Sequence, residues 1–345
     1  GCNNEVAAPD IEQVPISFTA NLPTLSVDSQ TRATSFVKGD QVGIVATNVD
    51  NESPLPTAEE WSVGNLYMNH IVGTMGDATW THGYPEYSIS LPSVWYWHFE
   101  ANKYLGFVAY SPIPSTDAKI TRPSNDMNLT VQRGVENNFF PDLLYTDVMG
   151  NYNKSRVSVL LDFKHAMTRL AVKVIAINKD GKVLESGHPV DKLQIVSLNI
   201  NTKVTQGIFN LVSSQWALSS PATNVNGQTA YTLVDPNAPQ KIPYTDASTS
   251  TYLLPQTAAT NTALLSSLNI KIKDTSTDIE VGGEYTLDKF KQLDETPIKL
   301  EMGKTAILVV KLQYTAIQPN LPTIKMEGQL VDWDYKGTST VVITK

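Results

Sequence analysis

The sequence has one cysteine, Cys2, among its 345 residues. A single thiol cannot form a disulfide within the chain, and a thiolate metal site needs several cysteines. The sequence is also poor in charge, with 17% charged residues, a net charge of −8 and no cluster of lysine and arginine. Because nucleic acids bind to basic surfaces, this composition excludes DNA and RNA as partners.

Long apolar runs and catalytic motifs are missing as well. No segment comes near the ~20 consecutive apolar residues that a transmembrane helix needs. There is no zinc-protease motif and no nucleophile elbow. Metal-ligand spacing is absent among the five histidines, which are His70, His82, His98, His165 and His188. We therefore expect no catalytic centre, no metal site and no cofactor, and we expect that the protein is not an enzyme.

Two short patterns imitate ligand sites. The residues from Gly303 to Thr305 resemble the end of a phosphate-binding loop, but Ile298 stands where that loop has its first glycine. A strand also follows where a helix is needed, so a tight turn explains these residues better. Asp332 and Asp334 flank Trp333 and have side chains that a divalent cation accepts. Two carboxylates on one face of a strand are, however, more often simply solvated.

The sequence does contain many short alternating segments separated by turns. It has 20 prolines, 19 glycines and 41% hydrophobic residues, and its length suits two domains, since single cores stop growing near ~250 to 300 residues. Strand-sized runs with turn signals every ~8 to 12 residues predict antiparallel β-sandwiches in both halves. We assign residues 3–158 to an N-terminal domain and residues 159–345 to a C-terminal domain.

The longest run without glycine or proline is residues 156–177, RVSVLLDFKHAMTRLAVKVIAI. Apolar residues alternate with polar ones in its first half and return with a period of two in its second half. This pattern predicts two consecutive strands that lead from one domain to the next. A single helix is the competing interpretation, but the four valines and two isoleucines weigh against it. We expect its main apolar side chains to be buried, namely Phe163, Leu170, Val172 and Val174.

Glycine-containing pairs mark the expected hairpin turns at residues 180–181, 226–227 and 282–283. Residues 287–293 are the best candidate for a short helix. Further expected strands lie at residues 16–22, 41–47, 66–72, 87–91, 105–110, 306–314, 321–331 and 338–344.

Aromatic residues gather in the first half of the chain. Trp95, Tyr96 and Trp97 precede His98 and have the chemistry of a stacking platform for a sugar. Packing in the core or at a domain interface is the alternative, because aromatic rings bury much apolar area.

The amino-terminal residues suggest an anchored surface protein. Gly1-Cys2-Asn3-Asn4 is similar to the start of a bacterial lipoprotein, in which a signal peptide is removed before a cysteine that then carries lipid. An ordinary exposed cysteine is the alternative. The residues up to Pro15 suit a flexible tether. Next come the strand at residues 16–22 and a polar loop at residues 25–35, which is a predicted site of proteolytic nicking.

Several of these segments together resemble the fimbrillin family of Bacteroidales, which comprises the pilins of type V fimbriae and fimbrillin-like relatives. The matching features span nearly the whole chain and occur in the family's order. They are the terminal cysteine, ISFTA at 16–20, TRA at 31–33, KGDQVG at 38–43, WYW at 95–97, LGFVAYSP at 105–112, DLLYT at 142–146, FKHAMTRLAVKV at 163–174, LPQ at 254–256 and EMGK at 301–304.

The resemblance implies two tandem transthyretin-like β-sandwich domains and export as a lipoprotein, with lipid on Cys2, to the outer membrane and cell surface. In the family, an arginine-specific protease cuts after the first strand, here at Arg32-Ala33, and a strand from another fimbrial subunit replaces the expelled one. Residues 338–345 match the region that supplies such a donor strand. The implied partners are therefore other fimbrial subunits, the outer-membrane lipid and a host or bacterial surface ligand.

The carboxyl end departs from this pattern, because only a dozen residues follow Trp333. Its last strand can therefore pair within its own domain instead. A non-polymerising surface module that binds a glycan or a protein stays open as the alternative function. For Arg32, the plain alternative to a cleavage site is a solvated charge on a loop.

Overall fold

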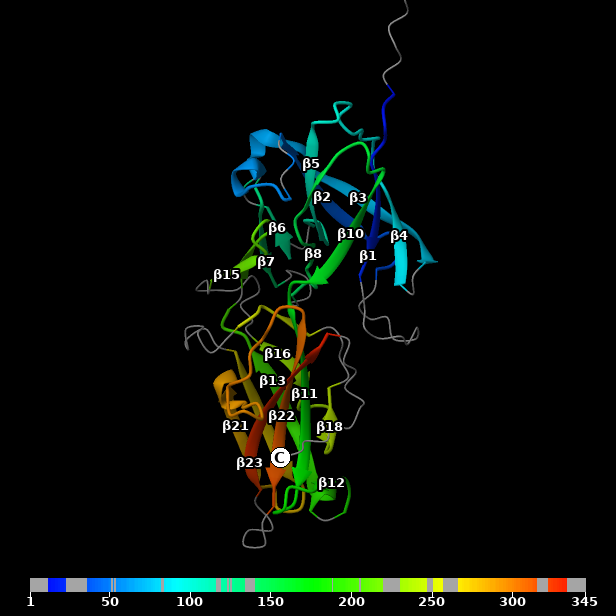
Figure 1. Ribbon diagram of the computed structural model, residues 1–345. Helices are drawn as coiled ribbons and strands as arrows, with labels where there is room; N and C mark the ends of the chain where they lie inside the picture. Colours follow the sequence, from blue (N-terminus) through cyan, green and yellow to red (C-terminus); the bar gives the residue numbers. More distant parts are fainter. Residues whose placement is uncertain are drawn as a thin grey trace, which may run out of the picture.

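The computed structural model describes residues 12–22, 36–50, 52, 54–81, 84–115, 119–122, 124, 126–133, 140–187, 189–204, 206–219, 230–246, 251–256, 266–314 and 322–333. These residues form two β-rich lobes that follow one another along the long axis of the molecule (Figure 1). The predicted all-β fold is confirmed. Among the described residues, no helix has the length and apolar character needed to cross a membrane.

The first lobe is built around an eight-stranded sheet that closes on itself. Its order is β2-β3-β4-β1-β10-β8-β5-β9, and an additional pairing of β2 with β5 completes a ring of strands. The strands are β1 Ser17–Asn21, β2 Gln41–Val49, β3 Leu66–Thr81, β4 Tyr84–Ser90, β5 Tyr104–Ser111, β8 Leu144–Thr146, β9 Met149–Tyr152 and β10 Ser158–His165. The ring has its own apolar core, which includes Phe18, Ile44, Phe107 and Phe163.

A four-stranded sheet packs beside this ring. Its order is β15-β14-β7-β6, with β6 Ile120–Thr121, β7 Asn128–Gln132, β14 Gln206–Asn210 and β15 Gln215–Ser219. The hairpin of β14 and β15 comes from the second half of the sequence but pairs with β7 of the first lobe. Strand β10 likewise lies in the first lobe's ring. The change of sheet along the chain therefore falls between β10 and β11, not between residues 158 and 159, and residues 206–219 return to the first lobe.

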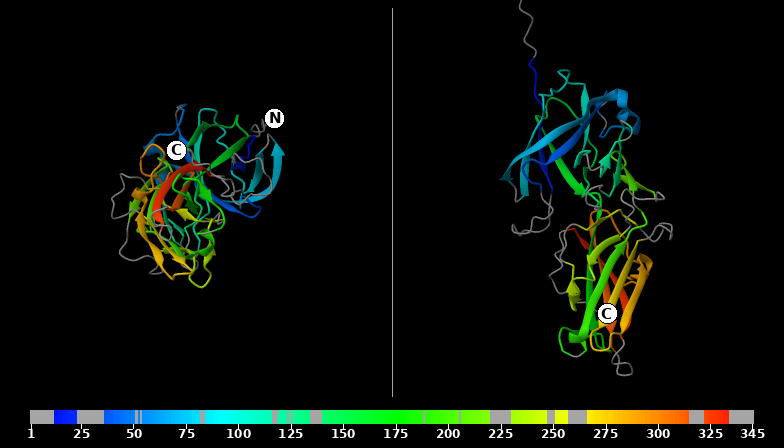
Figure 2. Two further views of the ribbon diagram at one scale, coloured as in Figure 1. Left: turned by 90° about the horizontal axis from the view of Figure 1, so that it is seen from below. Right: turned by 180° about the vertical axis from the view of Figure 1, so that it is seen from behind.

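The second lobe is a sandwich of two sheets (Figure 2). One sheet has the order β12-β11-β22-β23, with β18 and β19 also paired to β11, and the other has the order β16-β13-β20-β21, with β17 paired to β13. Their bounds are β11 Thr168–Ile177, β12 Val183–Leu184, β13 Leu193–Asn201, β16 Ala230–Val234, β17 Gln240–Lys241, β18 Tyr244–Thr245, β19 Tyr252–Leu253, β20 Ser267–Asp274, β21 Glu280–Thr286, β22 Lys304–Gln313 and β23 Thr323–Asp332. Alternate residues of facing strands, such as Val172 and Ile270, belong to one apolar core.

Most pairings are antiparallel, as predicted, but two are parallel. Strand β1 runs parallel to β10, and β11 runs parallel to β22. In each pair the partners lie more than a hundred residues apart in the sequence. Because no hairpin connects them, nothing forces the antiparallel direction.

The central run of the sequence forms the two strands predicted for it, β10 and β11. Burial alternates along β10, and all four residues expected in the core, Phe163, Leu170, Val172 and Val174, are buried. The two strands separate at Ala166 and Met167, where the chain passes from one lobe to the other. A helix is therefore excluded for this run.

Of the glycine-containing turns expected from the sequence, the one at 180–181 is confirmed and the one at 282–283 is wrong. Asp180 and Gly181 do connect a hairpin, since β11 pairs with β12. The pair at 282–283 is not a turn, because β21 runs straight through it along β20. Gly282 has φ +136°, and a Cβ atom there would lie 2.0 Å from the carbonyl oxygen of Ile270, so its glycine allows a close approach of backbones.

The short helix expected at residues 287–293 is only a single 3₁₀ turn, η5 Leu287–Lys289. The other 3₁₀ turns are η1 Ala58–Trp61, η2 Val63–Asn65 and η3 Val190–Lys192. Gly303 has φ +77° in a turn directly before β22, in agreement with the tight turn expected there. The expected turn at 226–227 and the strand at 338–344 lie outside the described residues.

Candidate functional site: the first strand in its groove

Strand β1 lies between two strands of the ring that do not pair with each other. It pairs antiparallel with β4 on one side and parallel with β10 on the other. Phe18, for example, lies opposite Ile89 of β4 and Val159 of β10. Removal of β1 would therefore open the ring and leave two strand edges with unpaired backbone groups.

The side chains of β1 and its flanking residues alternate as the sequence predicted. Ile16, Phe18, Ala20 and Leu22 are all buried in the core of the ring. The ring of Phe18 meets that of Phe107 edge to face at a centroid distance of 5.7 Å. Burial of a large apolar side chain contributes ~1.5–3 kcal/mol, so the three large residues together contribute about 5–9 kcal/mol. The prediction that residues 16–22 form an integral strand of the first domain is confirmed.

Backbone hydrogen bonds fix the strand where it enters the ring. The amide of Ile16 donates to the carbonyl of Trp95 at 2.8 Å, and the amide of Trp97 donates to the carbonyl of Val14 at 3.0 Å. On the other side, the amide of Ser17 donates to the carbonyl of Val157 at 3.3 Å. The start of β1 is thus hydrogen-bonded to the connection between β4 and β5 on one side and to the residue before β10 on the other.

The chain is anchored separately after the predicted cleavage loop. Phe36 is buried, and its ring lies edge to face against Tyr87 at 5.9 Å and against Phe163 at 5.1 Å. The hydroxyl of Tyr87 donates to the carbonyl of Phe36 at 2.6 Å. Phe36 thus contacts β4 and β10, the two strands that flank β1, and a cut between β1 and Phe36 would remove none of these contacts. Arg32 and Ala33 lie outside the described residues, as does Cys2.

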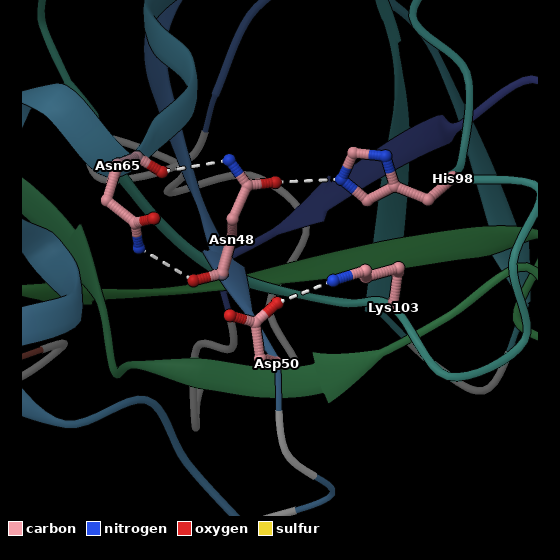
Figure 3. A network of polar contacts seen from close by, with 5 residues as sticks. All are labelled: Asn48, Asp50, Asn65, His98 and Lys103. Carbon is pink, nitrogen blue, oxygen red and sulfur yellow. Dashed lines mark hydrogen bonds and ion pairs between the residues drawn. The ribbon is translucent and has the colours of Figure 1, made fainter.

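A polar network closes the same end of the first lobe at which β1 enters (Figure 3). Asn48 and Asn65 exchange two amide-to-carbonyl hydrogen bonds, of 2.7 and 3.0 Å. The Nε2 atom of His98 lies 2.7 Å from Oδ1 of Asn48, and Nζ of Lys103 lies 2.9 Å from Oδ1 of Asp50. These contacts tie the connection between β4 and β5 to the end of β2.

The aromatic residues around 95–97 are mainly packing groups. Trp61 and Trp97 are buried, and Trp95 packs edge to face on Tyr67 at 5.3 Å. Tyr67 in turn donates its hydroxyl proton to the carbonyl of Tyr96 at 2.6 Å. The packing interpretation is therefore correct for this cluster. Trp95, Tyr96 and Trp97 do not form a continuous exposed platform.

The structure does not bring the histidines of the described residues together. His70 is buried between the ring and the four-stranded sheet, with Nδ1 2.9 Å from the hydroxyl of Tyr110 and Nε2 3.0 Å from the carbonyl of Asp126. Burial, reinforced by the charge of Arg122, lowers the pKa of His70 to about 4. His165 lies where the two lobes meet, 3.0 Å from Asp142.

No group of three or more metal-binding side chains occurs within the described ranges. Asp332, one of the two carboxylates considered for a cation, instead pairs with Lys304 at 3.2 Å. Asp334 lies outside the described residues.

Comparison with known proteins agrees with this architecture. The model of the family described as fimbrillin-like matches residues 31–333. The chain belongs to the fimbrillin-like family. Among solved structures, it is similar to a candidate cell adhesion protein from Bacteroides uniformis ATCC 8492, at 11% identity and a TM-score of 0.52, covering 94% of this chain and 100% of the other. A candidate cell adhesion protein from Bacteroides ovatus ATCC 8483 is also similar, at 15% identity and a TM-score of 0.50, covering 94% and 99%.

At these identities the structural likeness shows the fold alone. A search of curated proteins finds no match. For this fimbrillin-like chain, sequence reasoning found β1 and its apolar face but missed the closure of the ring and the role of Phe36. The only sequence signal for the role of Phe36 was its position as an isolated aromatic residue directly after a polar loop.

Proposed function

We propose that this fimbrillin-like protein is a fimbrial subunit at the cell surface that becomes able to assemble when its first strand is removed, and that it serves adhesion. It carries no enzymatic activity in this proposal. Lipid on Cys2 holds the uncut form at the outer membrane, and cleavage at Arg32-Ala33 separates β1 from the rest of the chain.

The observation that carries the proposal is the position of β1 between β4 and β10. After the cut, the strand is held only by noncovalent contacts, and the groove beneath it has an apolar floor with unpaired edges on both sides. Such a groove is costly to expose, so an extended strand from a second subunit is its natural replacement. The proposed donor is residues 338–345 of another copy or of a related fimbrial subunit.

Digestion with an arginine-specific protease tests the cleavage step. Arg32→Lys should resist cutting before residue 33 and stay monomeric, whereas the wild type should form polymers visible by electron microscopy. Arg156→Lys is the matched control, because Arg156 is an exposed arginine that stacks on Tyr152 at 3.9 Å at the other side of the β1 entry. If the Arg32 variant polymerises like the wild type, or if neither forms polymers, Arg32 is not the switch.

The lipid anchor has its own test. Mass spectrometry of the protein from its native host should show an acylated Cys2, and Cys2→Ala should be released from the membrane fraction. An unmodified thiol, or a variant that stays equally membrane-bound, would contradict the lipid anchor. Neither result would bear on the proposed assembly step.

A surface binding module that does not polymerise is the second candidate. An open cavity of about 470 Å³ on the second lobe favours it, since its lining combines an aromatic ring with charged and hydroxyl groups: Lys203, Glu284, Tyr285, Thr286, Lys289 and Met326. Binding of glycans by the uncut monomer, together with no polymers after digestion, would favour the module over the fimbrial subunit.

A further inference from the structure

The end of the first lobe that faces away from the second lobe carries exposed apolar side chains. Val94 is 59% exposed, Phe99 is 55% exposed and Val157 is 62% exposed. In Figure 1, the connections that carry them lie at the top of the first lobe, around the amino-terminal segment. Exposed large apolar residues that gather at one place usually mark a contact surface.

Hydrogen bonds show that these residues surround the entry of β1. Trp95, next to Val94, accepts from Ile16, and Val157 accepts from Ser17. On the same side, Nζ of Lys154 donates to the carbonyl of Phe99 at 2.6 Å. The apolar side chains therefore flank the point where the amino-terminal tether leaves the lobe.

The connection that carries Phe99 is held in a defined position. Its neighbour His98 contacts Asn48, and Lys103 pairs with Asp50, as Figure 3 shows. A second tie comes from Asn153, whose Nδ2 donates to the carbonyl of Ala101 at 3.0 Å. Phe99 is thus presented to solvent by a fixed scaffold, which reduces the entropy cost of a contact.

The length of the amino-terminal tether determines which partner this surface can contact. Glu12, the first described residue of the lobe, lies ten positions after Cys2 in the sequence. Fully extended, ten residues span at most about 35 Å, so a lipid anchor at Cys2 would keep this end of the molecule close to the bilayer. Tethering makes the second contact intramolecular, which raises its effective concentration.

We propose that, in the uncut protein, this end rests on the lipid surface with Phe99, Val94 and Val157 inserted among the headgroups. The inference depends on the proposed anchor at Cys2 and adds a second, apolar contact that fixes how the protein lies on the bilayer. Charge contributes little, because Lys154 and Arg156 are accompanied by the acidic Glu12 and Glu100.

The single cysteine allows a test that does not require native acylation. The full chain is coupled through Cys2 to maleimide-bearing vesicles of phosphatidylcholine and phosphatidylethanolamine, and the reference is the same chain coupled to maleimide-polyethylene glycol. Amide hydrogen exchange in residues 93–101 and 154–158 should be at least threefold slower on vesicles. The effect should be the same in 50 and 500 mM salt, because it is apolar.

Two variants make the test specific. The double variant Phe99→Ser/Val157→Ser should lose the protection, whereas Leu293→Ser, at a leucine of the second lobe that is 74% exposed, should keep it. All these side chains are exposed, so an unchanged unfolding midpoint is expected and is checked first. Equal exchange on vesicles and on polyethylene glycol would overturn the proposal, as would protection that high salt removes. Protection that appears with polyethylene glycol and grows with protein concentration would also overturn it and would indicate contact between copies instead.

Discussion

Leu170 and Leu293 show how far one residue type can differ in its contribution to stability. Leu170 is buried in β11 among residues of both sheets of the second lobe, whereas Leu293 lies on a surface connection. The period of two in the sequence predicted the first position. Nothing in the local sequence around 287–293 distinguished an exposed leucine from a buried one in a short helix.

Leu170→Ala should lower the free energy of unfolding by roughly 2–5 kcal/mol, because it removes buried methyl groups and leaves a cavity. Leu293→Ala should change it by less than about 0.5 kcal/mol. Urea denaturation followed by tryptophan fluorescence measures both. A small effect of Leu170→Ala would show that the central run is not part of the core.

His70 predicts a pH dependence of stability. Its pKa is about 4 in the folded protein and near 6.5 in the unfolded chain, so the unfolded chain binds the proton first as the pH falls. Stability should therefore drop between pH 6.5 and about 4 and then level off for this group. The full loss is about 3 kcal/mol.

Denaturation of the wild type and of His70→Gln at several pH values measures this contribution. The difference between the two proteins should shrink on acidification in that window, because the glutamine keeps hydrogen-bonding atoms but does not titrate. Parallel curves for the two proteins would mean that His70 is protonated without penalty in the folded state.

At the scale of elements, the sequence predicted strands well and pairings poorly. Alternation located β1 and β10, because burial on one face fixes a period of two. Apolar runs of strand length located β2 and β5, and β-branched residues located β11, whose residues are buried on both faces. Which strands become neighbours depends on contacts between distant segments, so the parallel pairing of β1 with β10 and the return of β14 to β7 had no local signal. The same limit explains the candidate site, whose apolar strand was predicted but whose groove was not.

The glycine pair in β21 provides a matched test of the corrected turn. Gly282→Ala should destabilise the protein by on the order of 2 kcal/mol or more, since φ is +136° and a Cβ atom would meet the backbone of Ile270. Gly283→Ala should be tolerated, because the nearest atom to its added Cβ is 3.8 Å away, on Tyr285. Thermal unfolding compares the two variants. Similar melting temperatures would contradict the continuous strand.

At the scale of the whole molecule, the two halves of the sequence do not divide into two independent lobes. The first lobe needs the β14–β15 hairpin from residues 206–219 to complete its second sheet, and β10 to hold β1. Loss of β1 would therefore affect a ring whose other strands are stabilised from elsewhere in the chain. This arrangement suits a strand that is exchanged while the remainder stays folded.

The cut protein should keep its first strand until a competing strand arrives. With about 5–9 kcal/mol from side-chain burial and a ladder of hydrogen bonds on both sides, spontaneous loss of residues 1–32 should be slow. Native mass spectrometry of the cut chain at low concentration should show the fragment still bound. Addition of a synthetic peptide of residues 338–345, TSTVVITK, should speed its release in proportion to the peptide concentration, because an incoming strand displaces β1 step by step.

A peptide of residues 15–22 serves as the positive control, since it has the sequence that the groove already binds. The peptide TSTSVSTK, with serine in place of Val341 and Ile343, serves as the negative control. If only the 15–22 peptide releases the fragment, the groove exchanges strands but takes its donor from another sequence. If no peptide has an effect, β1 stays a permanent part of the ring after the cut, and assembly must use another surface.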